Sequence, residues 1–549
     1  MIAPAQAIPK ALLLASLLML VLPISSYFFA RRVFKDYFEY SDSLVYIASA
    51  AVVVFVIHSI LLFVVILLIM EKTRRVVIRG VGMVSCLGVT ASAVWTRLLG
   101  NETGIGVLDR KDAKMHGLSP CHIGGTVNDE ALESRWRELL ADQSRLRGVE
   151  KQISRRAMSR TSILGMLAAQ EAVKQSGWLP QDSQTPSLRD YSSIDDISYR
   201  AGTYFSTGLE GIEEIITSQA SIDKKGYPGM GAHVLPRTLA NMPVAHISRA
   251  WGLRGPTMSC STACASGLHS VGEAFRMIQH GEADMVLAGA SEAPLNAWSL
   301  MAFSRIRALS METKAEIASR PFDSSRDGFV MAEGAAAIVL EAWPPKNSST
   351  SSSQSPIAEV LGFGRSADAF SLVSPEPSGD GAFRCMKAAL DDAGIESIEE
   401  LGHINCHATS THVGDVIELS AVARLLSSYG KRSANASPIQ INSVKGHLGH
   451  SLGAAGAIEA VYSALAAQNG VCVANRNLEK PISPDEVIKV LENTGDKEMA
   501  RKMTENLFEN ITFEADHEWA KRSKRRLVLT NSFGFGGTNG CLLLSNWVE

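Results

Sequence analysis

Residues 261–267 read Ser261-Thr262-Ala263-Cys264-Ala265-Ser266-Gly267, a segment in which a single thiol lies between small residues. The amphipathic run 268–278 follows directly. The spacing of apolar residues in that run predicts a helix, which places Cys264 at a helix N-terminus. Unpaired backbone N–H groups and the positive end of the helix dipole favour a thiolate at this position. Cys264 is therefore a candidate nucleophile, with a small buried core cysteine as the alternative interpretation.

Strands and helices alternate on both sides of this segment. The β-branched, apolar residues 76–84 and 283–290 predict strands, the second directly after the predicted helix. The Pro- and Ser-rich residues 344–356 have the composition of a flexible linker, and a strand-like run begins each of the two parts that flank it. This pattern predicts an α/β protein.

Two histidine-bearing segments supply partners for the thiol. They read NCHATST over residues 405–411 and KGHLGHSLGAAG over residues 445–456. The chain then closes with NSFGFGGTN over residues 531–539, a glycine-dense turn that can bring backbone N–H groups close to a developing oxyanion. A cysteine with two distant histidines has the composition of a thiol acyl-transfer site, whose residues meet in space.

These four segments, in this order, resemble the signature blocks of the β-ketoacyl-[acyl-carrier-protein] synthases of bacteria and mitochondria. RPFD over residues 320–323 and RDGFVMAEG over residues 326–334 agree with the resemblance, which covers about residues 75–549. It implies a thiolase-like fold of two similar halves in α-β-α-β-α layers. The halves are expected at residues 75–343 and 357–549, with the linker 344–356 between them.

The resemblance also implies a decarboxylative condensation in fatty-acid biosynthesis. Cys264 would accept the acyl chain, and His407 and His450 would hydrogen-bond the malonyl thioester oxygen while an enolate forms. The backbone N–H groups of Cys264 and Phe535 would form the oxyanion hole. The product would be a 3-oxoacyl-acyl-carrier protein, longer by two carbons.

Supporting roles come from the same resemblance. Lys445 and Glu459 match a charge pair beside the site, Thr409 and Thr411 match hydroxyls that meet the phosphopantetheine arm, and Phe535 matches a gating side chain. For Lys445 and Phe535 a purely structural role is the alternative. The resemblance implies acyl-carrier protein as partner, a homodimer, and no cofactor beyond the phosphopantetheine on that carrier.

Composition excludes some classes of function. The 549 residues are 46% hydrophobic and 20% charged with a net charge of −3, so the chain can bury more than one core. No basic stripe with interleaved aromatic residues suggests nucleic-acid binding. The eight cysteines lack paired spacing, which argues against a disulfide framework or a metal site. The charged segment 482–502 matches nothing in the family pattern and is predicted to be an exposed insertion.

Two N-terminal segments are long and apolar. Residues 11–30 hold no charge, and residues 43–70 hold none apart from the titratable His58. Each can cross about 30 Å of hydrocarbon, so residues 1–72 are predicted to form a two-helix transmembrane hairpin in membrane lipid. The outer flanks carry five basic residues against three in the connecting loop, which places both chain ends in the cytosol.

The hairpin resembles small endoplasmic-reticulum proteins that assist assembly of the vacuolar proton-ATPase, through LVLPISSYFF over residues 20–29 and VIH over residues 56–58. This implies the endoplasmic reticulum membrane, a cytosolic enzyme domain and the membrane sector of that ATPase as partner. A generic anchor is the alternative. If the chain merges two genes, the enzyme part is expected in mitochondria.

Two other function classes stay open. One is a membrane assembly factor, for which the hairpin is the functional part. The other is a thiolase-type acyltransferase, which would need a second cysteine near the closing glycine turn. The chain has Phe535 and Asn539 there, and Cys541 lies beyond the turn.

Overall fold

The computed structural model describes residues 74–108, 120–141, 155–178, 197–345, 355–433, 435–493 and 496–548, together with Ser59. The chain divides into two units, Met1–Arg74 and Arg75–Glu549, and the second contains the strands and the helices from α3 onward. Apart from Ser59, the predicted spans 11–30 and 43–70 lie outside the described residues. Within the described ranges, no helix is both long and apolar enough to cross a membrane.

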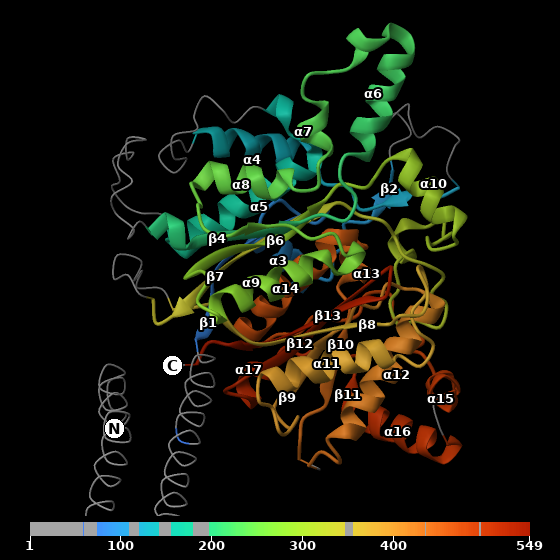
Figure 1. The fold of residues 1–549 in the computed structure, drawn as a ribbon. Helices are drawn as coiled ribbons and strands as arrows, with labels where there is room; N and C mark the ends of the chain where they lie inside the picture. The colour runs from blue at the N-terminus through green and yellow to red at the C-terminus, as the bar shows by residue number, and fades with distance from the viewer. Residues whose placement is uncertain are drawn as a thin grey trace, which may run out of the picture. The chain divides into compact units, whose positions relative to one another are not determined.

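The first half of the second unit runs from β1 to β7 (Figure 1). Its strands are β1 (Arg75–Ser85), β2 (Gly106–Val107), β3 (Ile123–Gly124), β4 (Ala201–Ser206), β5 (Thr257–Met258), β6 (Met285–Glu292) and β7 (Gly334–Trp343). Its helices are α3 (Ala91–Leu99), α4 (Asp129–Ala141), α5 (Arg160–Ser176), α6 (Ile212–Lys225), α7 (Val234–Thr238), α8 (Met242–Trp251), α9 (Ser266–Gln279) and α10 (Ala297–Arg305).

The second half begins at β8, beyond the predicted linker, of which residues 346–354 lie outside the described residues. Its strands are β8 (Ala358–Ala367), β9 (Leu401–Asn405), β10 (Ile439–Asn442), β11 (Ile511–Thr512), β12 (Leu527–Gly534) and β13 (Thr538–Asn546). Its helices are α11 (Asp380–Asp392), α12 (His412–Ser428), α13 (Lys445–Leu448), α14 (Ala455–Asn469), α15 (Pro484–Glu492), α16 (Lys497–Asn510) and α17 (Trp519–Arg522).

The two halves repeat one strand topology. The first half has the order β1-β7-β6-β4-β5, and the second has the order β8-β13-β12-β9-β10 with β11 added at its edge. In both halves the first two pairings are antiparallel, and the other two join parallel strands. β1 also pairs with β8, which joins the strands of the two halves into one 11-stranded sheet. This repetition agrees with the predicted fold of two similar halves.

The elements stack in five layers, α-β-α-β-α, as predicted (Figure 1). α5 and α8 cover the outer face of the first sheet half, and α11 and α12 lie on the outer side of the second. α9 and α14 pack against each other between the two sheet halves. Most of their apolar side chains, among them Phe275 and Tyr462, are buried in the central core cluster.

Burial on both faces explains the composition of the strands. Every residue of β4 and β6 is buried, and both strands are parallel neighbours covered by helices above and below. Such strands are expected to be nearly continuous apolar runs without alternation.

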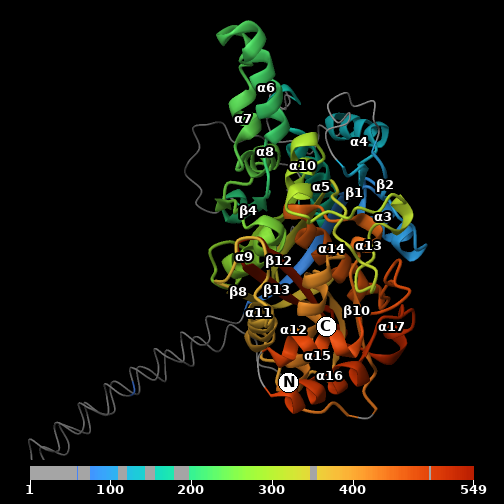
Figure 2. The ribbon, with the colours of Figure 1, turned by 90° about the vertical axis from the view of Figure 1, so that its right-hand side faces the viewer.

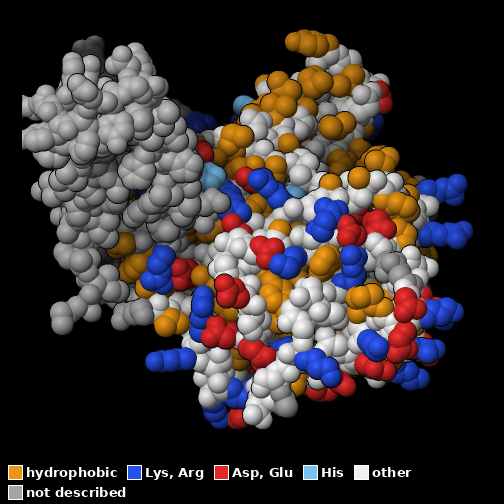
Figure 3. Space-filling view, turned by 60° about the horizontal axis from the view of Figure 1, so that its bottom comes forward, with side chains coloured by type: hydrophobic (Ala, Val, Ile, Leu, Met, Phe, Trp, Pro, Cys, Tyr) orange, Lys and Arg blue, Asp and Glu red, His pale blue; other side chains and the backbone are white. Residues whose placement is uncertain are grey.

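One part of the first half projects from the body. α6 and α7 form an arm that extends away from the layers in both ribbon views (Figures 1 and 2). α6 buries none of its residues, and hydrophobic side chains gather on the projecting part of the surface (Figure 3). Tyr227, in the turn that follows α6, is 90% exposed and Leu235 in α7 is 67% exposed.

The segment 482–502 is not a purely exposed insertion, which corrects the prediction. It contains α15 and the start of α16, and both helices pack against α12. Val487 and Leu491 of α15 are buried, because the helix is amphipathic and turns its apolar side to the core of the second half. Its charged residues cover the outer side of that contact.

Candidate active site

Cys264 lies in a tight turn at the start of the middle-layer helix α9. The 3₁₀ turn Ala263–Ala265 leads directly into α9, and Cys264 is 9% exposed. Ala263 has φ of 49°, a left-handed conformation that costs a non-glycine residue about 1–3 kcal/mol. Ser532 of β12 holds the turn from the other half, because its Oγ donates to the Cys264 carbonyl at 2.8 Å.

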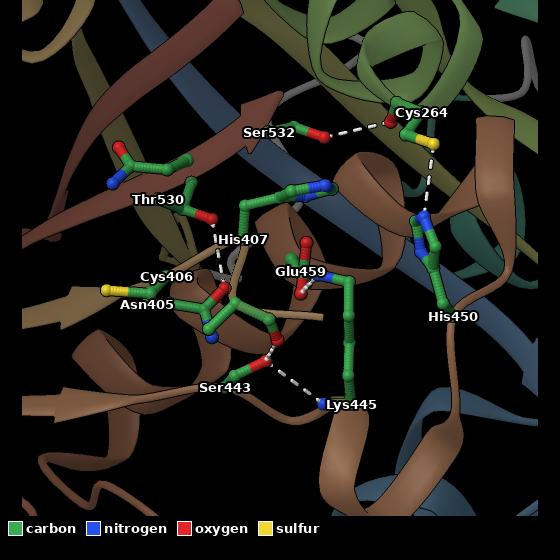
Figure 4. A network of polar contacts seen from close by, with 12 residues as sticks. Cys264, Asn405, Cys406, His407, Ser443, Lys445, His450, Glu459, Thr530 and Ser532 are labelled. Carbon is green, nitrogen blue, oxygen red and sulfur yellow. Dashed lines mark hydrogen bonds and ion pairs between the residues drawn. The ribbon is translucent and has the colours of Figure 1, made fainter. Parts of the chain in front are cut away.

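The two predicted histidines meet at this thiol. His407 follows the carboxyl end of β9, and His450 follows α13. Nε2 of His450 lies 3.0 Å from Sγ of Cys264. The rings of His407 and His450 stand almost perpendicular, with centroids 5.3 Å apart. In Figure 4 the His407 ring points toward the space between Cys264 and His450.

The closing glycine turn supplies backbone donors. Gly534 and Thr538 are opposed at the end of the β12–β13 hairpin, and Gly536 and Gly537 between them have φ of 85° and 70°. Consecutive positive φ values are readily adopted only by glycine. The turn brings the N–H of Phe535 to the sulfur of Cys264, where this group and the N–H of Cys264 itself lower the pKa of the thiol.

Burial dominates the charge state of the nucleophile. It raises the pKa of the Cys264 thiol to about 12, against the opposing effects of the Lys445 charge and the two N–H groups. Burial therefore opposes the thiolate that the helix N-terminus favours, because desolvation of the charged sulfur raises the pKa more than the Lys445 charge and the N–H groups lower it. The proton must leave as the sulfur attacks, and Nε2 of His450 is placed to take it.

Both imidazoles are neutral at physiological pH. Burial lowers the pKa of His407 and of His450 well below the ordinary value, and the charge of Lys445 lowers both further. Nδ1 of each ring has no hydrogen-bond partner among the described residues. Neither ring is thus fixed in one tautomer, so Nε2 of His450 can accept a proton in one step and donate in another.

Lys445 and Glu459 form a buried ion pair behind the histidines, as the resemblance implied (Figure 4). They stand on α13 and α14, and neither side chain lines the active-site cavity. Burial raises the pKa of Glu459 to about 7, and Lys445 opposes that rise. Removing one partner would leave an uncompensated buried charge, which typically costs about 3–5 kcal/mol.

A cavity of about 420 Å³ opens beside the thiol. Six of the predicted residues line it, namely Cys264, His407, His450, Thr409, Thr411 and Phe535. The two threonine hydroxyls lie 3.2 Å apart, and Thr411 also caps α12 by accepting from Gly414 N at 3.2 Å. The cavity therefore brings the nearly buried nucleophile and two hydroxyl groups into one space.

Glu418 belongs to the site although it was not predicted from the sequence. Its carboxylate accepts from the backbone N–H of His407 at 2.9 Å and of Ala408 at 2.8 Å, and so fixes the loop that carries His407. Asn531 also donates to it, at 3.0 Å. The available signal was a carboxylate on the buried side of α12, where Asp415 is also buried.

The thiolase-type alternative receives no support from the geometry. Cys541, the second cysteine that a thiolase-type site would need, is buried in β13 and does not line the cavity. A buried thiol beside two neutral imidazoles defines the class instead, an enzyme that transfers acyl groups through cysteine.

Comparison with known protein families supports this class of enzyme. The model described as "Beta-ketoacyl synthase, N-terminal domain" matches residues 73–343, and "Beta-ketoacyl synthase, C-terminal domain" matches residues 357–479. The chain therefore belongs to the beta-ketoacyl synthase family and is a β-ketoacyl-[acyl-carrier-protein] synthase, an acyltransferase. Enzymes of this family need no cofactor beyond the phosphopantetheine that acyl-carrier protein carries.

Relatives match over most of their length. The 3-oxoacyl-[acyl-carrier-protein] synthase 2 of Rhizobium meliloti is 34% identical over 484 residues, covering 86% of this chain and 99% of the relative. The mitochondrial 3-oxoacyl-[acyl-carrier-protein] synthase of Arabidopsis thaliana is 33% identical over 477 residues, covering 86% and 93%.

Solved structures share the fold. The crystal structure of a beta-ketoacyl synthase from Burkholderia phymatum has a TM-score of 0.67 at 25% identity, covering 87% of this chain and all of that one. A ketosynthase solved in complex with its type II polyketide acyl-carrier protein has a TM-score of 0.66 at 23% identity. It covers 87% of this chain and all of its own, and shows the fold alone.

Proposed function

We propose that residues 75–549 condense an acyl thioester with malonyl-acyl-carrier protein, giving 3-oxoacyl-acyl-carrier protein and carbon dioxide in fatty-acid biosynthesis. The observation that carries this proposal is the 3.0 Å approach of His450 Nε2 to Cys264 Sγ, both of which line the cavity. The names of the relatives support the fatty-acid substrate class.

The first half-reaction loads Cys264. As Sγ attacks the acyl carbonyl, the thiol proton passes to neutral Nε2 of His450, and charge develops on the carbonyl oxygen. The N–H groups of Cys264 and Phe535 are positioned to stabilise that charge. The tetrahedral intermediate then expels the carrier thiol, which takes the proton from His450, and the acyl group stays on sulfur.

The second half-reaction begins with loss of carbon dioxide from the malonyl group. The C–C bond electrons move onto the thioester as an enolate, whose oxygen needs hydrogen-bond donors. His407 and His450 are neutral and perpendicular to each other, so two N–H groups can converge on that oxygen. Such donors act mainly on charge that exists in the transition state.

Condensation completes the cycle at the same oxyanion hole. The enolate carbon attacks the acyl carbonyl on Cys264, the new C–C bond forms, and the C–S bond breaks as the intermediate collapses. The released sulfur takes up a proton from solvent and restores the buried neutral thiol, so the overall reaction consumes one proton. Lys445 acts on this cycle through its charge, which adds to the effect of burial and lowers the pKa of both histidines further.

Acyl-carrier protein is the inferred partner, since both substrates arrive on its phosphopantetheine arm. The polar walls made by Thr409 and Thr411 suit the amides of that arm. The ketosynthase that was solved with its own carrier protein has the same fold.

A second copy of the chain is the other inferred partner. β5 is the terminal strand of its sheet half within the described residues, paired with β4 alone, and both of its residues are exposed. Unpaired edges readily add a strand from another chain. The projecting arm adds exposed apolar side chains, including Tyr227 and Leu235.

Location is inferred from the same relatives. The Arabidopsis relative is named mitochondrial, which supports mitochondria for residues 75–549 if they are made separately from the hairpin. If the chain is one protein, the predicted spans 11–30 and 43–70 favour the endoplasmic reticulum membrane with the enzyme facing the cytosol. A role of the hairpin in vacuolar ATPase assembly stays a prediction from its sequence.

Reconstitution with acyl- and malonyl-acyl-carrier protein tests the proposed reaction. The wild type should release carbon dioxide and form the 3-oxoacyl product, and Cys264→Ala should form none. Cys86→Ala is the matched control, because Cys86 is a partly buried packing cysteine outside the cavity. Product formation by Cys264→Ala at the control rate would contradict the proposal.

A further inference from the structure

His269 connects the two backbone segments that supply the oxyanion hole. It stands one turn into α9, and Nδ1 lies 2.8 Å from Oγ1 of Thr262. Nε2 lies 3.2 Å from the carbonyl oxygen of Asn539. Thr262 comes two residues before Cys264, and Asn539 comes four residues after Phe535. One imidazole therefore joins the turn of the nucleophile to the strand that follows the glycine turn.

The chemistry of the partners fixes the direction of both bonds. A carbonyl oxygen can only accept, so Nε2 of His269 carries the hydrogen and donates to Asn539. In the neutral ring Nδ1 then has a free lone pair, and the Thr262 hydroxyl donates to it. Burial lowers the pKa of His269, which keeps the ring in this neutral form.

Hydrogen bonds fix Thr262, the residue before Ala263, whose backbone next to the nucleophile is strained. Its N–H donates to Ser266 Oγ at 2.9 Å, and its carbonyl accepts from Ala265 N and from Thr538 Oγ1, each at 3.1 Å. His269 fixes the remaining polar group, the hydroxyl. A left-handed non-glycine residue such as Ala263 persists only where its surroundings determine it fully.

Hydrogen bonds also fix Asn539, the residue at the other end of the His269 bridge. Asn539 Nδ2 donates to Asp368 Oδ1 at 2.6 Å and to Ser366 Oγ at 3.2 Å, which anchors the strand to β8 and the loop after it. Gly540 leaves room for the ring, because a Cβ there would lie 3.0 Å from Cδ2 of His269. The bridge thus has fixed supports on both sides.

We propose that His269 is a positioning residue for the oxyanion hole. Through Thr262 and Asn539 it sets the spacing between the N–H of Cys264 and the N–H of Phe535. It does not line the cavity, so it acts without touching substrate. This inference rests on the proposed function, because the hole serves acyl transfer and condensation, whereas decarboxylation takes place at His407 and His450.

Two conservative variants separate the bonds of the bridge. In His269→Gln the terminal amide reaches the place of Nε2 and can donate to Asn539, but it offers no acceptor at the place of Nδ1. In His269→Asn the amide oxygen takes the place of Nδ1 and can accept from Thr262, but it does not reach Asn539. His269→Leu removes both bonds. His280→Leu is the control, because His280 caps the C-terminal end of the same helix and its side chain is 53% exposed.

The experiment compares two rates for each variant after thermal unfolding has established that it is folded. One is single-turnover transfer from an acyl-acyl-carrier protein to Cys264, and the other is carbon dioxide release from malonyl-acyl-carrier protein. His269→Leu should lower the maximal rate of acyl transfer by about 10², the worth of one oxyanion donor, with an unchanged half-saturation concentration. Carbon dioxide release should stay at the level of His280→Leu, and the Gln and Asn variants should retain intermediate transfer rates.

A folded His269→Leu in which both rates fall equally, or in which acyl transfer keeps the wild-type rate, would overturn the positioning role. If His269→Leu does not fold, the same comparison is made on the Gln and Asn variants, where equal losses of both rates have the same meaning. A wild type that transfers no acyl group would overturn the proposed function itself, and the two failures are therefore distinguishable.

Discussion

Replacing Gly534 with alanine tests how closely the two halves of the oxyanion hole must approach. Gly534 is the last residue of β12, directly before Phe535. A Cβ at this position would lie 2.5 Å from the carbonyl oxygen of Thr262 and 2.7 Å from Oγ1 of Thr538. The Thr262 oxygen belongs to the backbone and cannot rotate away, so the backbones themselves must separate.

The size of the effect follows from these distances. Ordinary contact begins at 3.4 Å, so Gly534 and Thr262 must move apart by about 0.9 Å from 2.5 Å. Oxyanion donors act over about 2.7–3.1 Å, and such a shift removes the Phe535 N–H from that range. Loss of one donor corresponds to about 10²–10³ in rate, and overpacking costs about 1–3 kcal/mol of stability.

Single-turnover acylation of Cys264 measures this loss, with thermal unfolding to show that the variant is folded. Gly534→Ala should transfer acyl groups about 10²–10³ more slowly than the wild type. Gly106→Ala is the matched control, because a Cβ at that position has no neighbour within 4 Å. A folded Gly534→Ala with the transfer rate of Gly106→Ala would refute the geometry proposed for the hole.

Three further predictions concern the histidines, the ion pair and the sheet edge. His407→Ala should keep acylation of Cys264 and lower carbon dioxide release from malonyl-acyl-carrier protein by about 10²–10³, and equal losses in both assays would argue against separate roles. Lys445→Met removes a charge that lowers the pKa of His407 and His450, so both pKa values rise and the acid limb of the decarboxylation rate moves to higher pH. An unmoved pH–rate profile would show that the charge does not reach the rings. Met258→Lys places a charge on the exposed edge strand β5 and should yield monomers in light scattering, whereas an unchanged dimer mass would exclude this edge as the interface.

The sequence predicted which residues form the site, but it did not predict the pKa of the thiol. Cys264, His407 and His450 stand in turns that follow strands or begin helices, and local residue types mark such turns. The pKa of the thiol depends instead on what buries it. Burial by layers from both halves raises that pKa to about 12, and no local pattern around Cys264 reports this packing.

The sequence also did not predict contacts between residues that lie far apart in the chain. His269 lies inside the helix that the sequence predicted, but its partner Asn539 is 270 positions away in the chain. Glu418 supports His407 from a helix that was not connected with the site in advance. The start of α15 was readable, since Ser483 and Glu486 form a capping box, yet its contact with α12 depends on tertiary packing.

The central claim is that Cys264 carries the acyl chain between the two half-reactions, and mass spectrometry of the intact protein tests it most directly. Incubation with acyl-acyl-carrier protein alone should add one acyl group to the wild type, on the peptide that contains Cys264. Addition of malonyl-acyl-carrier protein should then discharge that group into the 3-oxoacyl product. An acyl group found on another residue, or one that malonyl-acyl-carrier protein does not remove, would contradict the account.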